Sequence, residues 1–393
     1  MTMTKFRMLI SSKRIQASIF CSLAVFAACI YPHRPPQLDF AEQVQLNGQL
    51  RVATQMTTDN IPMSSSRAGF ELALAQLFAR HLGVGLQLVQ TNNTVYRSLR
   101  ADQADVGLVH YTTAPNTQSG FSFIEPYLKR HLLPMASLEP ADDELSSVKL
   151  AWAYRGPNAE KFNALVENFF AQIRNDGTFD HLYQQYFDHM EMSVAESRSF
   201  RYNLNQRLPE YQTAFEKNAK KTQLDWRLLA AIGYQESHWD SDAVSPTGVR
   251  GLMMLTQITA DEVGVDNRHN AKQSIAGGST YFRKLKDRLD AEIPEPHRTW
   301  MALAAYNMGI GHLEDARTLT RRLKGDANNW FDVKRSIPLL QQYQYYSQVS
   351  NGYAMGARQS LLYVENVRRY FDILIGFHPE PVDVHHTSVV AMR

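Results

Sequence analysis

Cysteine is almost absent from this chain of 393 residues, which carries only Cys21 and Cys29. Because both lie near the N-terminus, the body of the protein has no disulfide framework and no cysteine metal site. An excess of charge of either sign is also lacking, since 41 Lys and Arg face 39 Asp and Glu. A net charge of +2 gives no electrostatic case for a nucleic-acid partner, and none is predicted.

The chain also lacks a long uninterrupted apolar run at its N-terminus. Residues 15–28 are mainly apolar but are interrupted by Gln16 and Ser18, and a spanning helix needs about 20 apolar residues. Basic residues precede this segment, at Lys5, Arg7, Lys13 and Arg14. A basic start followed by a short apolar stretch is typical of an export signal, which we place at residues 1–29. The body is therefore expected outside the cytoplasm.

The end of this segment, Phe26-Ala-Ala-Cys29, resembles a bacterial lipobox, with Phe26 where Leu is usual. The resemblance implies lipidation of Cys29 and a membrane anchor; an uncleaved signal anchor and an ordinary signal cut nearby are the alternatives. Ile30 is not the Asp that favours retention at the inner membrane. We therefore expect the periplasmic face of the outer membrane of a Gram-negative bacterium. Residues 30–44, rich in proline, are expected to be a spacer.

The length predicts two or three domains, and residues 45–190 form the first. A strand-like run, Leu50–Thr54, is followed by helical spacing over 69–83 and an alternating strand over 85–89. Residues 101–109 then give a helix end, a turn and another strand. This alternation predicts an α/β domain with a parallel sheet.

The same order, with the Phe123-Ile-Glu-Pro-Tyr127 block and closing helices over 158–187, resembles family 3 of the periplasmic solute-binding proteins. The arginine that clamps a ligand carboxylate in that family is replaced here by Thr117. Only residues 137–156 lie between the first lobe and the closing helices, so the second lobe is expected to be abbreviated. We prefer a docking or positioning module to an amino-acid binder. A docking module would take a partner from the cell-wall machinery, and a small ligand is the alternative.

Residues 191–207 are polar and are interpreted as a linker to a second domain, 208–376. No strand-like alternation of any length follows residue 200, and residues 226–234 and 300–308 read as apolar helices. The second domain is therefore predicted to be mostly helical. The tail, 377–393, is polar, and its pair His385-His386 would bind metal only with further ligands, so no metal site is predicted.

Glu236 is the candidate catalytic residue. Asp225 is a good N-cap for an apolar helix that ends near Glu236 and Ser237. A helix C-terminus disfavours negative charge, and burial favours the protonated carboxyl. That is the state a general acid needs near neutral pH. The alternative is a surface glutamate at a frayed helix end.

Four blocks in this order surround Glu236 with a recognisable pattern. They are Gln235-Glu-Ser237, Ser245-Pro-Thr-Gly-Val-Arg-Gly-Leu-Met-Met-Leu255, Ala304-Ala-Tyr-Asn-Met-Gly309 and Tyr363-Val-Glu-Asn-Val-Arg-Arg-Tyr370. Over residues 205–375 they resemble the soluble lytic transglycosylase domain, a lysozyme-like helical fold that cleaves bacterial peptidoglycan. Some members of that family carry a solute-binding-like domain in front of the catalytic one.

This resemblance implies particular roles. Glu236 matches an acid/base that works without a second carboxylate and closes a 1,6-anhydro ring, and no metal or organic cofactor is implied. Ser237 matches a residue that orients the substrate or the carboxyl. Tyr306 matches a tyrosine near that carboxyl, Asn307 a contact to sugar amides, and Tyr363 a tyrosine near the site. The expected partners are peptidoglycan glycan strands.

The block Gly251-Leu-Met-Met254 departs from the commoner Gly-Leu-Met-Gln. Met254 cannot replace the hydrogen bonding of a glutamine amide. We expect Met253 either to line the substrate site or to pack in the core, and the sequence does not favour one over the other.

Asp240 and Asp242 are candidates for a second carboxylate, which would make the protein a hydrolytic muramidase. We prefer turn or cap roles, because both follow directly after the helix. A non-catalytic protein that binds or senses cell-wall glycan is the other alternative, and the presence of Glu236 argues against it.

Overall fold

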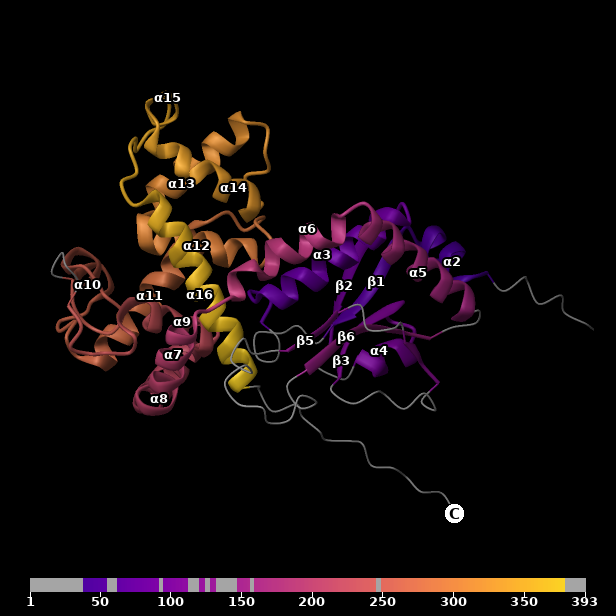
Figure 1. Ribbon diagram of the computed structural model, residues 1–393, viewed down its shortest axis with the longest axis horizontal. Coiled ribbons are helices and arrows are strands. Elements are labelled where there is room, and N and C mark those ends of the chain that lie inside the picture. The colour runs from indigo at the N-terminus through magenta and orange to yellow at the C-terminus, as the bar shows by residue number, and fades with distance from the viewer. Residues whose placement is uncertain are drawn as a thin grey trace, which may run out of the picture.

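The computed structural model of the chain describes residues 38–54, 62–91, 95–111, 120–123, 128–131, 147–155, 159–244 and 249–378. Several predictions from the sequence fall outside these ranges: the export signal with Cys29, Thr117, most of the Phe123–Tyr127 block, residues 245–248, and the tail with His385-His386. Figure 1 shows an α/β domain beside a helical one, as the sequence predicts. No helix in the described ranges has the length and apolarity needed to cross a bilayer.

The described strands of the first domain form one mixed sheet. Its order is β2-β1-β3-β6-β4, with β5 paired to β6. Strands β1, β2 and β3 are parallel, but β6 is antiparallel to β3, β4 and β5. The predicted parallel sheet is therefore confirmed for β1, β2 and β3, the strands from which it was inferred, and β6 adds an antiparallel partner to which that inference did not extend. A parallel partner needs a crossover, usually helical, whereas short strands precede β6 in the described residues. The bounds are β1 Gln49–Thr54, β2 Gly85–Gln90, β3 Val106–Tyr111, β4 Ser122–Phe123, β5 Leu128–His131 and β6 Ser147–Tyr154.

Both faces of this sheet are covered. Val52 and Trp152 point into the larger core with helices α3, α5 and α6, while the adjacent residues Ala53 and Ala153 point to a smaller core with α4. This alternation is the period of two expected of a strand. The helices are α2 Phe40–Asn47, α3 Ser66–His81, α4 Val95–Arg100, α5 Ala159–Asn175 and α6 Thr178–Phe187.

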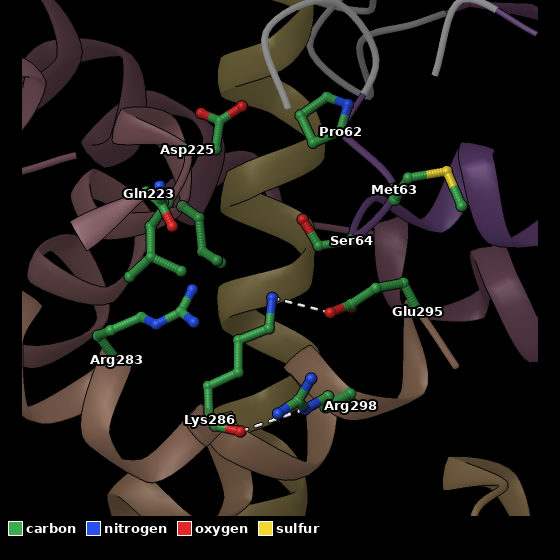
Figure 2. A pocket seen from close by; sticks show the side chains of 11 residues that line it. Pro62, Met63, Ser64, Gln223, Asp225, Arg283, Lys286, Glu295 and Arg298 are labelled. Carbon is green, nitrogen blue, oxygen red and sulfur yellow. Dashed lines mark hydrogen bonds and ion pairs between the residues drawn. The ribbon is translucent and has the colours of Figure 1, made fainter. Parts of the chain in front are cut away.

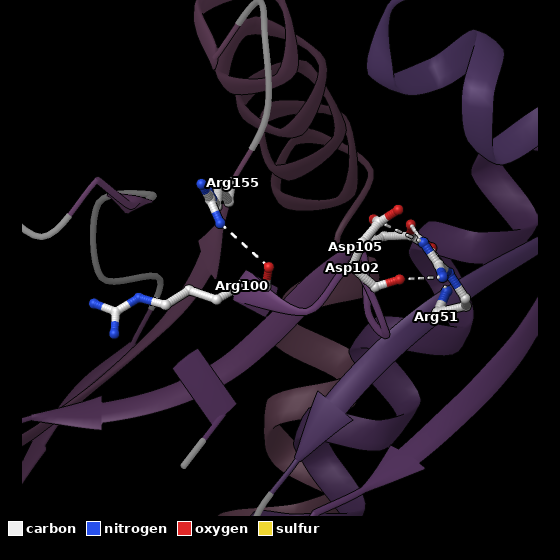
Figure 3. Close-up of polar contacts among 5 residues, drawn as sticks. All are labelled: Arg51, Arg100, Asp102, Asp105 and Arg155. Atoms are coloured by element: carbon white, nitrogen blue, oxygen red, sulfur yellow. Dashed lines mark hydrogen bonds and ion pairs between the residues drawn. The ribbon is translucent and has the colours of Figure 1, made fainter. Parts of the chain in front are cut away.

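Hydrogen bonds from Arg51 to Asp102 and Asp105 fix β1 against the turn before β3, as Figure 3 shows. The backbone N–H of Arg51 donates to Asp105 Oδ2 at 2.7 Å, and its Nη2 donates to Asp105 Oδ1 at 2.7 Å. Its Nη1 also donates to the carbonyl of Asp102, a residue in the left-handed region at φ 54°. These bonds tie the neighbouring strands β1 and β3 together near the N-terminal end of each.

The predicted linker over 191–207 is instead mostly helix α7, Val194–Gln206. Its N-terminus has a capping box, in which Ser193 and Glu196 each accept from the other's backbone N–H. Phe200 is fully buried and stacks on Tyr370 with 5.3 Å between ring centroids. The polar composition reflects a long exposed face, and a few apolar residues are enough to pack the helix onto the domain.

The second domain is mostly helical, as predicted. Helices α9 and α12 lie at its centre, and residues 229–232 and 301–305 have no exposed surface. In the described residues its extended pairings are isolated bridges that join Val244, Arg250 and Leu255. The elements are η3 Asp188–Met190, α8 Leu208–Thr222, α9 Trp226–Ser237, α10 Gln257–Val263, α11 Ala271–Arg288, α12 His297–Met308, α13 Ile310–Arg322, α14 Trp330–Ser336, η4 Ile337–Gln341, α15 Tyr343–Tyr346 and α16 Ala357–Phe377.

One hydrophobic core runs through both domains. Tyr186 at the end of α6 packs on Trp300 of α12 and on Phe331 of α14, with ring centroids 5.7 and 5.0 Å apart. The same cluster of buried residues includes Phe78 in the first domain and Leu229 in the second. The two domains therefore pack as one body rather than as two cores joined by a tether.

Candidate active site

Glu236 lies in the last turn of the buried helix α9. The helix begins as the sequence predicts, with the Asp225 side chain accepting from the backbone N–H of Arg227 at 2.7 Å. It ends at His238, which is left-handed with φ 54°, and Trp239 follows at φ 56°. Trp239 is fully buried and donates to the carbonyl of Ala230 at 2.8 Å. This sharp turn holds the end of the helix, and so Glu236, in a fixed place.

The carboxyl of Glu236 is surrounded by protein but keeps a partly exposed surface. Burial raises the pKa of Glu236 to about 7, and a hydrogen bond from Tyr363 opposes this shift. That bond runs from Tyr363 Oη to Glu236 Oε1 and is 2.7 Å long. Half of such groups carry a proton near neutral pH, so the carboxyl can give a proton and take one back.

Two tyrosines from different helices stand at this carboxyl. Tyr363 belongs to α16 and Tyr306 to α12, and their rings stack with centroids 6.4 Å apart. Burial, followed by the nearby Glu236, raises the pKa of both phenols well above the usual value. Both therefore stay protonated. Tyr363 donates to the carboxyl, whereas Tyr306 donates to the carbonyl of Met253 at 3.0 Å.

Ser237 is buried inside the protein, whereas Asn307 is exposed to solvent. Ser237 is buried, and its hydroxyl faces the carbonyls of Leu252 at 2.8 Å and Gly233 at 3.2 Å. It ties α9 to the neighbouring turn, and the expected role of Ser237 in orienting the substrate or the carboxyl stays a prediction. Asn307 is exposed at the end of α12, and its amide has no hydrogen-bond partner among the described residues. A substrate could therefore reach it.

Comparison with known proteins follows the two-domain division of the fold. Residues 213–329 match the model of the transglycosylase SLT domain, and residues 50–189 match that of the bacterial extracellular solute-binding proteins, family 3. Membrane-bound lytic murein transglycosylase F 1 of Alkalilimnicola ehrlichii is 35% identical over an alignment 427 positions long, gaps included, which covers 86% of each chain. The chain belongs to the membrane-bound lytic murein transglycosylase F family.

Other members of the family are more similar over shorter stretches. The proteins of Marinobacter nauticus and Pseudomonas putida are 45% and 49% identical over 238 and 224 residues. These matches cover 60% and 57% of this chain and 46% of each relative. The chain thus spans about half the length of these curated relatives.

In this member of the family, Met253 is a core residue. Its side chain has no exposed surface and packs against Gly278 of α11, where an added Cβ would lie 2.6 Å from the Met253 sulfur. Its N–H donates to the Ser274 hydroxyl at 3.0 Å. Of the two alternatives left open for Met253, its side chain therefore takes the one in which it packs in the core. Its backbone carbonyl serves the site by accepting from Tyr306.

Met253 belongs to a turn over residues 251–254, and the sequence analysis did not predict which residues support this turn. Gly251 has φ +88°, and an added Cβ would lie 1.9 Å from the carbonyl oxygen of Arg268. Ser274 and the pair Gly277-Gly278 are buried on α11 beneath the turn. Two adjacent glycines inside a helical pattern are a signal of close approach by another segment, and could have pointed to it.

Asp240 has the turn role that the sequence favours. Its Oδ1 accepts from the N–H of Asp242 at 3.0 Å, and its Oδ2 pairs with Arg207 Nη2 at 3.2 Å. Asp242 is exposed. In the described part of the chain, no carboxylate is among the causes that shift the pKa of Glu236. The site as described is built on one carboxyl group.

A separate cavity of about 310 Å³ lies at the other end of α9, between residues 62–64 of the first domain and α11 (Figure 2). Lys286 and Glu295 meet across it at 2.8 Å. Glu236 is eleven residues beyond Asp225 in the cavity wall, which is about 16 Å along a helix. The cavity is therefore distinct from the active site. No cluster of three or more His, Cys, Asp or Glu residues suited to a metal occurs in the described ranges.

Proposed function

We propose that the protein is a peptidoglycan lytic transglycosylase, which cleaves the MurNAc–GlcNAc β-1,4 bond without water and leaves 1,6-anhydro-MurNAc ends. The observation that carries this proposal is the carboxyl of Glu236, with a pKa of about 7 and a 2.7 Å hydrogen bond from Tyr363. Membership of the lytic murein transglycosylase F family supports it.

In the proposed reaction one group makes both proton transfers. Protonated Glu236 gives its proton to the glycosidic oxygen as the bond from that oxygen to C1 of MurNAc breaks. The carboxylate then takes the proton of the C6 hydroxyl while O6 bonds to C1. Atoms balance, because the proton lost in the first step returns in the second. A pKa near the working pH suits a group that must act as acid and then as base.

Tyr363 has a defined part in this cycle. Its hydroxyl donates to Oε1 of Glu236, and a hydrogen bond to the charged form stabilises the carboxylate after the proton has left. Tyr306 fixes the turn that carries Met253, and Asn307 offers an exposed amide to the N-acetyl groups of the glycan. Both proton transfers are assigned to Glu236, so the proposal uses no metal or organic cofactor.

A hydrolytic muramidase is the second candidate. Hydrolysis of a glycoside normally uses two carboxylates about 5–10 Å apart. Asp240 is engaged with Arg207 and with the backbone of Asp242, which argues against it as the second carboxylate. A glycan-binding protein without activity is the third candidate. A pKa of about 7 at Glu236 has no purpose in that case.

We place the protein in the cell envelope of a Gram-negative bacterium, at the periplasmic face of the outer membrane, anchored through lipidated Cys29. The Phe26-Ala-Ala-Cys29 pattern and the membrane-bound relatives support this placement. The domain limits 45–190 and 208–376 and the partner of the first domain are part of the same proposal. We add helix α7, residues 194–206, to the second domain of this proposal, because Phe200 stacks on Tyr370 of α16.

Mass spectrometry of muropeptides released from purified peptidoglycan tests the reaction. The chain lacking residues 1–29 should release products lighter than their hydrolysed counterparts by one water molecule. Products with ordinary reducing ends would make the protein a muramidase. No release by a folded sample would favour the binding protein.

A further inference from the structure

Helix α16 contacts Glu236 with one face and the first domain with another. Tyr363 faces Glu236 of the second domain, while Arg368, five residues later, lies about 140° around the helix. Asp372 follows one turn beyond Arg368 on the same side. Figure 1 shows α16 passing the ends of α3 and α6, which belong to the first domain. The helix that carries the site tyrosine therefore also meets the other domain.

Arg368 binds the C-terminal end of α6. It is 2% exposed, and its Nη2 donates to the carbonyls of Tyr186 at 3.2 Å and Gln185 at 3.4 Å. It also donates to the hydroxyl of Ser66 at 3.3 Å. The last carbonyls of a helix lack partners within the helix and lie at the negative end of its dipole. A buried guanidinium stabilises such a helix end, because it donates hydrogen bonds to the free carbonyls and carries a positive charge.

Asp372 binds the N-terminal end of α3. Its Oδ1 accepts from the backbone N–H of Ser66 at 3.2 Å, and its Oδ2 lies 3.4 Å from His189 Nε2. Burial, followed by the charge of Arg368, lowers the pKa of His189 to about 3, so this imidazole is neutral at pH 7. Helix α16 thus offers an anion to the start of one helix and a cation to the end of another.

The second site helix is held in the same way. The Arg368 guanidinium lies 3.8 Å from the centroid of the Trp300 ring on α12, and Trp300 Nε1 donates to the carbonyl of Ser64 at 3.2 Å. Tyr306 follows Trp300 by six residues on this helix. Both helices with tyrosines at Glu236 therefore contact the first domain elsewhere along their length.

We propose that Arg368 and Asp372 are positioning residues for the reaction, through which the first domain holds α16 where Tyr363 meets the carboxyl of Glu236. The inference rests on the proposed function of Glu236. It gives the first domain a mechanical part in catalysis that needs no ligand. A small rotation or slide of α16 would lengthen the 2.7 Å bond to Glu236, and the strength of a hydrogen bond falls steeply with distance and angle.

The charges around the two groups keep their titrations apart. Burial lowers the pKa of Arg368 to about 10, and the nearby groups Asp372, Glu365 and Tyr186 oppose this shift. The guanidinium is therefore charged at neutral pH. Burial, followed by the charge of Arg368, also lowers the pKa of His297 on α12 to about 4. Glu236 faces Tyr363 and Tyr306. A titration near pH 7 therefore reports Glu236 and not the domain contact.

The variant Arg368→Met in the full chain tests the proposal. We expect kcat on soluble peptidoglycan fragments to fall by up to about tenfold, no more than for Tyr363→Phe, because Arg368 acts through that hydrogen bond, with KM changed less than about twofold. The pKa of Glu236, followed by carboxyl ¹³C NMR, should rise in the same direction as in Tyr363→Phe. Arg368→Lys keeps the charge and should recover part of kcat. The double variant Arg368→Met/Tyr363→Phe should lose no more than Tyr363→Phe alone.

Arg198→Met is the matched control, because Arg198 is exposed on α7 and should leave both readings unchanged. If Arg368→Met does not fold, Asp372→Asn carries the same expectations in milder form. A folded variant with an unchanged Glu236 pKa, or full additivity in the double variant, would overturn the proposal. If the wild type releases no anhydro products, the proposed function fails, and the NMR titration still decides the positioning role.

Discussion

Glu236 sits where folding disfavours its charge, since burial raises its pKa to about 7 while the unfolded chain has a value of about 4.3. The folded state therefore binds this proton more tightly than the unfolded state does. The contribution of the group to stability is fully present below the unfolded pKa. It is lost as pH rises through the folded pKa. In the proposed reaction this buried acid is the group that gives and takes back the proton.

For the substitution Glu236→Gln we expect a loss of activity of about 10²- to 10⁴-fold, the usual contribution of general acid–base catalysis. The amide cannot ionise, so the free energy of unfolding should depend less on pH between about pH 4 and 7 than in the wild type. Anhydro-muropeptide release and thermal melts across that range measure both effects. An unfolded Glu236→Gln variant would mean that the carboxyl is structural.

Tyr363→Phe removes the hydrogen bond that lowers the pKa of Glu236. The pKa should rise, so the acid stays protonated to higher pH and the alkaline limb of kcat/KM against pH moves upward. The rate at the optimum should fall about tenfold, the loss expected for one hydrogen bond to a charged group. Tyr306→Phe is the comparison, because that hydroxyl bonds the Met253 carbonyl, and its limb should move less. An equal shift in both would contradict this assignment.

The roles of these tyrosines mark the limit of sequence reasoning at this scale. The motifs place both Tyr306 and Tyr363 near the carboxyl, but which hydroxyl bonds it depends on how α12 and α16 cross. Met253 is similar, because a methionine suits a core and a binding wall equally well. Only the close approach of Gly278 decides between them.

At the scale of elements, the turn over residues 251–254 links α9, α11 and α12. It receives the hydroxyls of Ser237 and Tyr306 and is held by Ser274. Its geometry depends on Gly251, where both the positive φ and the nearby Arg268 carbonyl exclude a side chain. The active site thus relies on a short loop with little freedom to change.

We expect Gly251→Ala to destabilise the fold by about 3 kcal/mol or more, since it adds a backbone clash to an unfavourable conformation. Gly264→Ala is the matched control. Gly264 also has a positive φ, of +71°, but no atom within 4 Å of an added Cβ. It should cost only about 1–2 kcal/mol, the penalty for a left-handed residue. Urea unfolding of the two variants makes the comparison, and equal losses would mean that the clash relaxes.

Local periodicity explains which elements the sequence predicts. The apolar helices α9 and α12 and the strands β1 and β2 were predicted because each pattern is complete within one segment. Helix α7 was missed because its polar residues outnumber Phe200 and Leu204, which pack it onto the second domain. The direction of β6 was missed because it depends on its sheet neighbours and not on its own residues.

At the scale of the whole molecule, one core and the polar contacts of α16 join the two domains. We therefore expect the chain to unfold in a single thermal transition, with calorimetric and van't Hoff enthalpies in agreement. Arg368→Met should lower the midpoint of the whole transition. Two separate transitions in the wild type, with only one shifted in the variant, would show that the domains fold independently.

The contact between Ser66 and Asp372 joins residues 306 positions apart. The start of α3 and the end of α6 lie early in the chain, but their partners Asp372 and Arg368 lie on the last helix, α16. These contacts can form only after α16 has been made. Contacts this distant in sequence form late and slowly. During synthesis these two helix ends lack the partners that α16 supplies until α16 has been made. A chain that stops before Arg368 would keep the packing of Tyr186 on Trp300 and Phe331 but lose the polar contacts of α16 with the first domain.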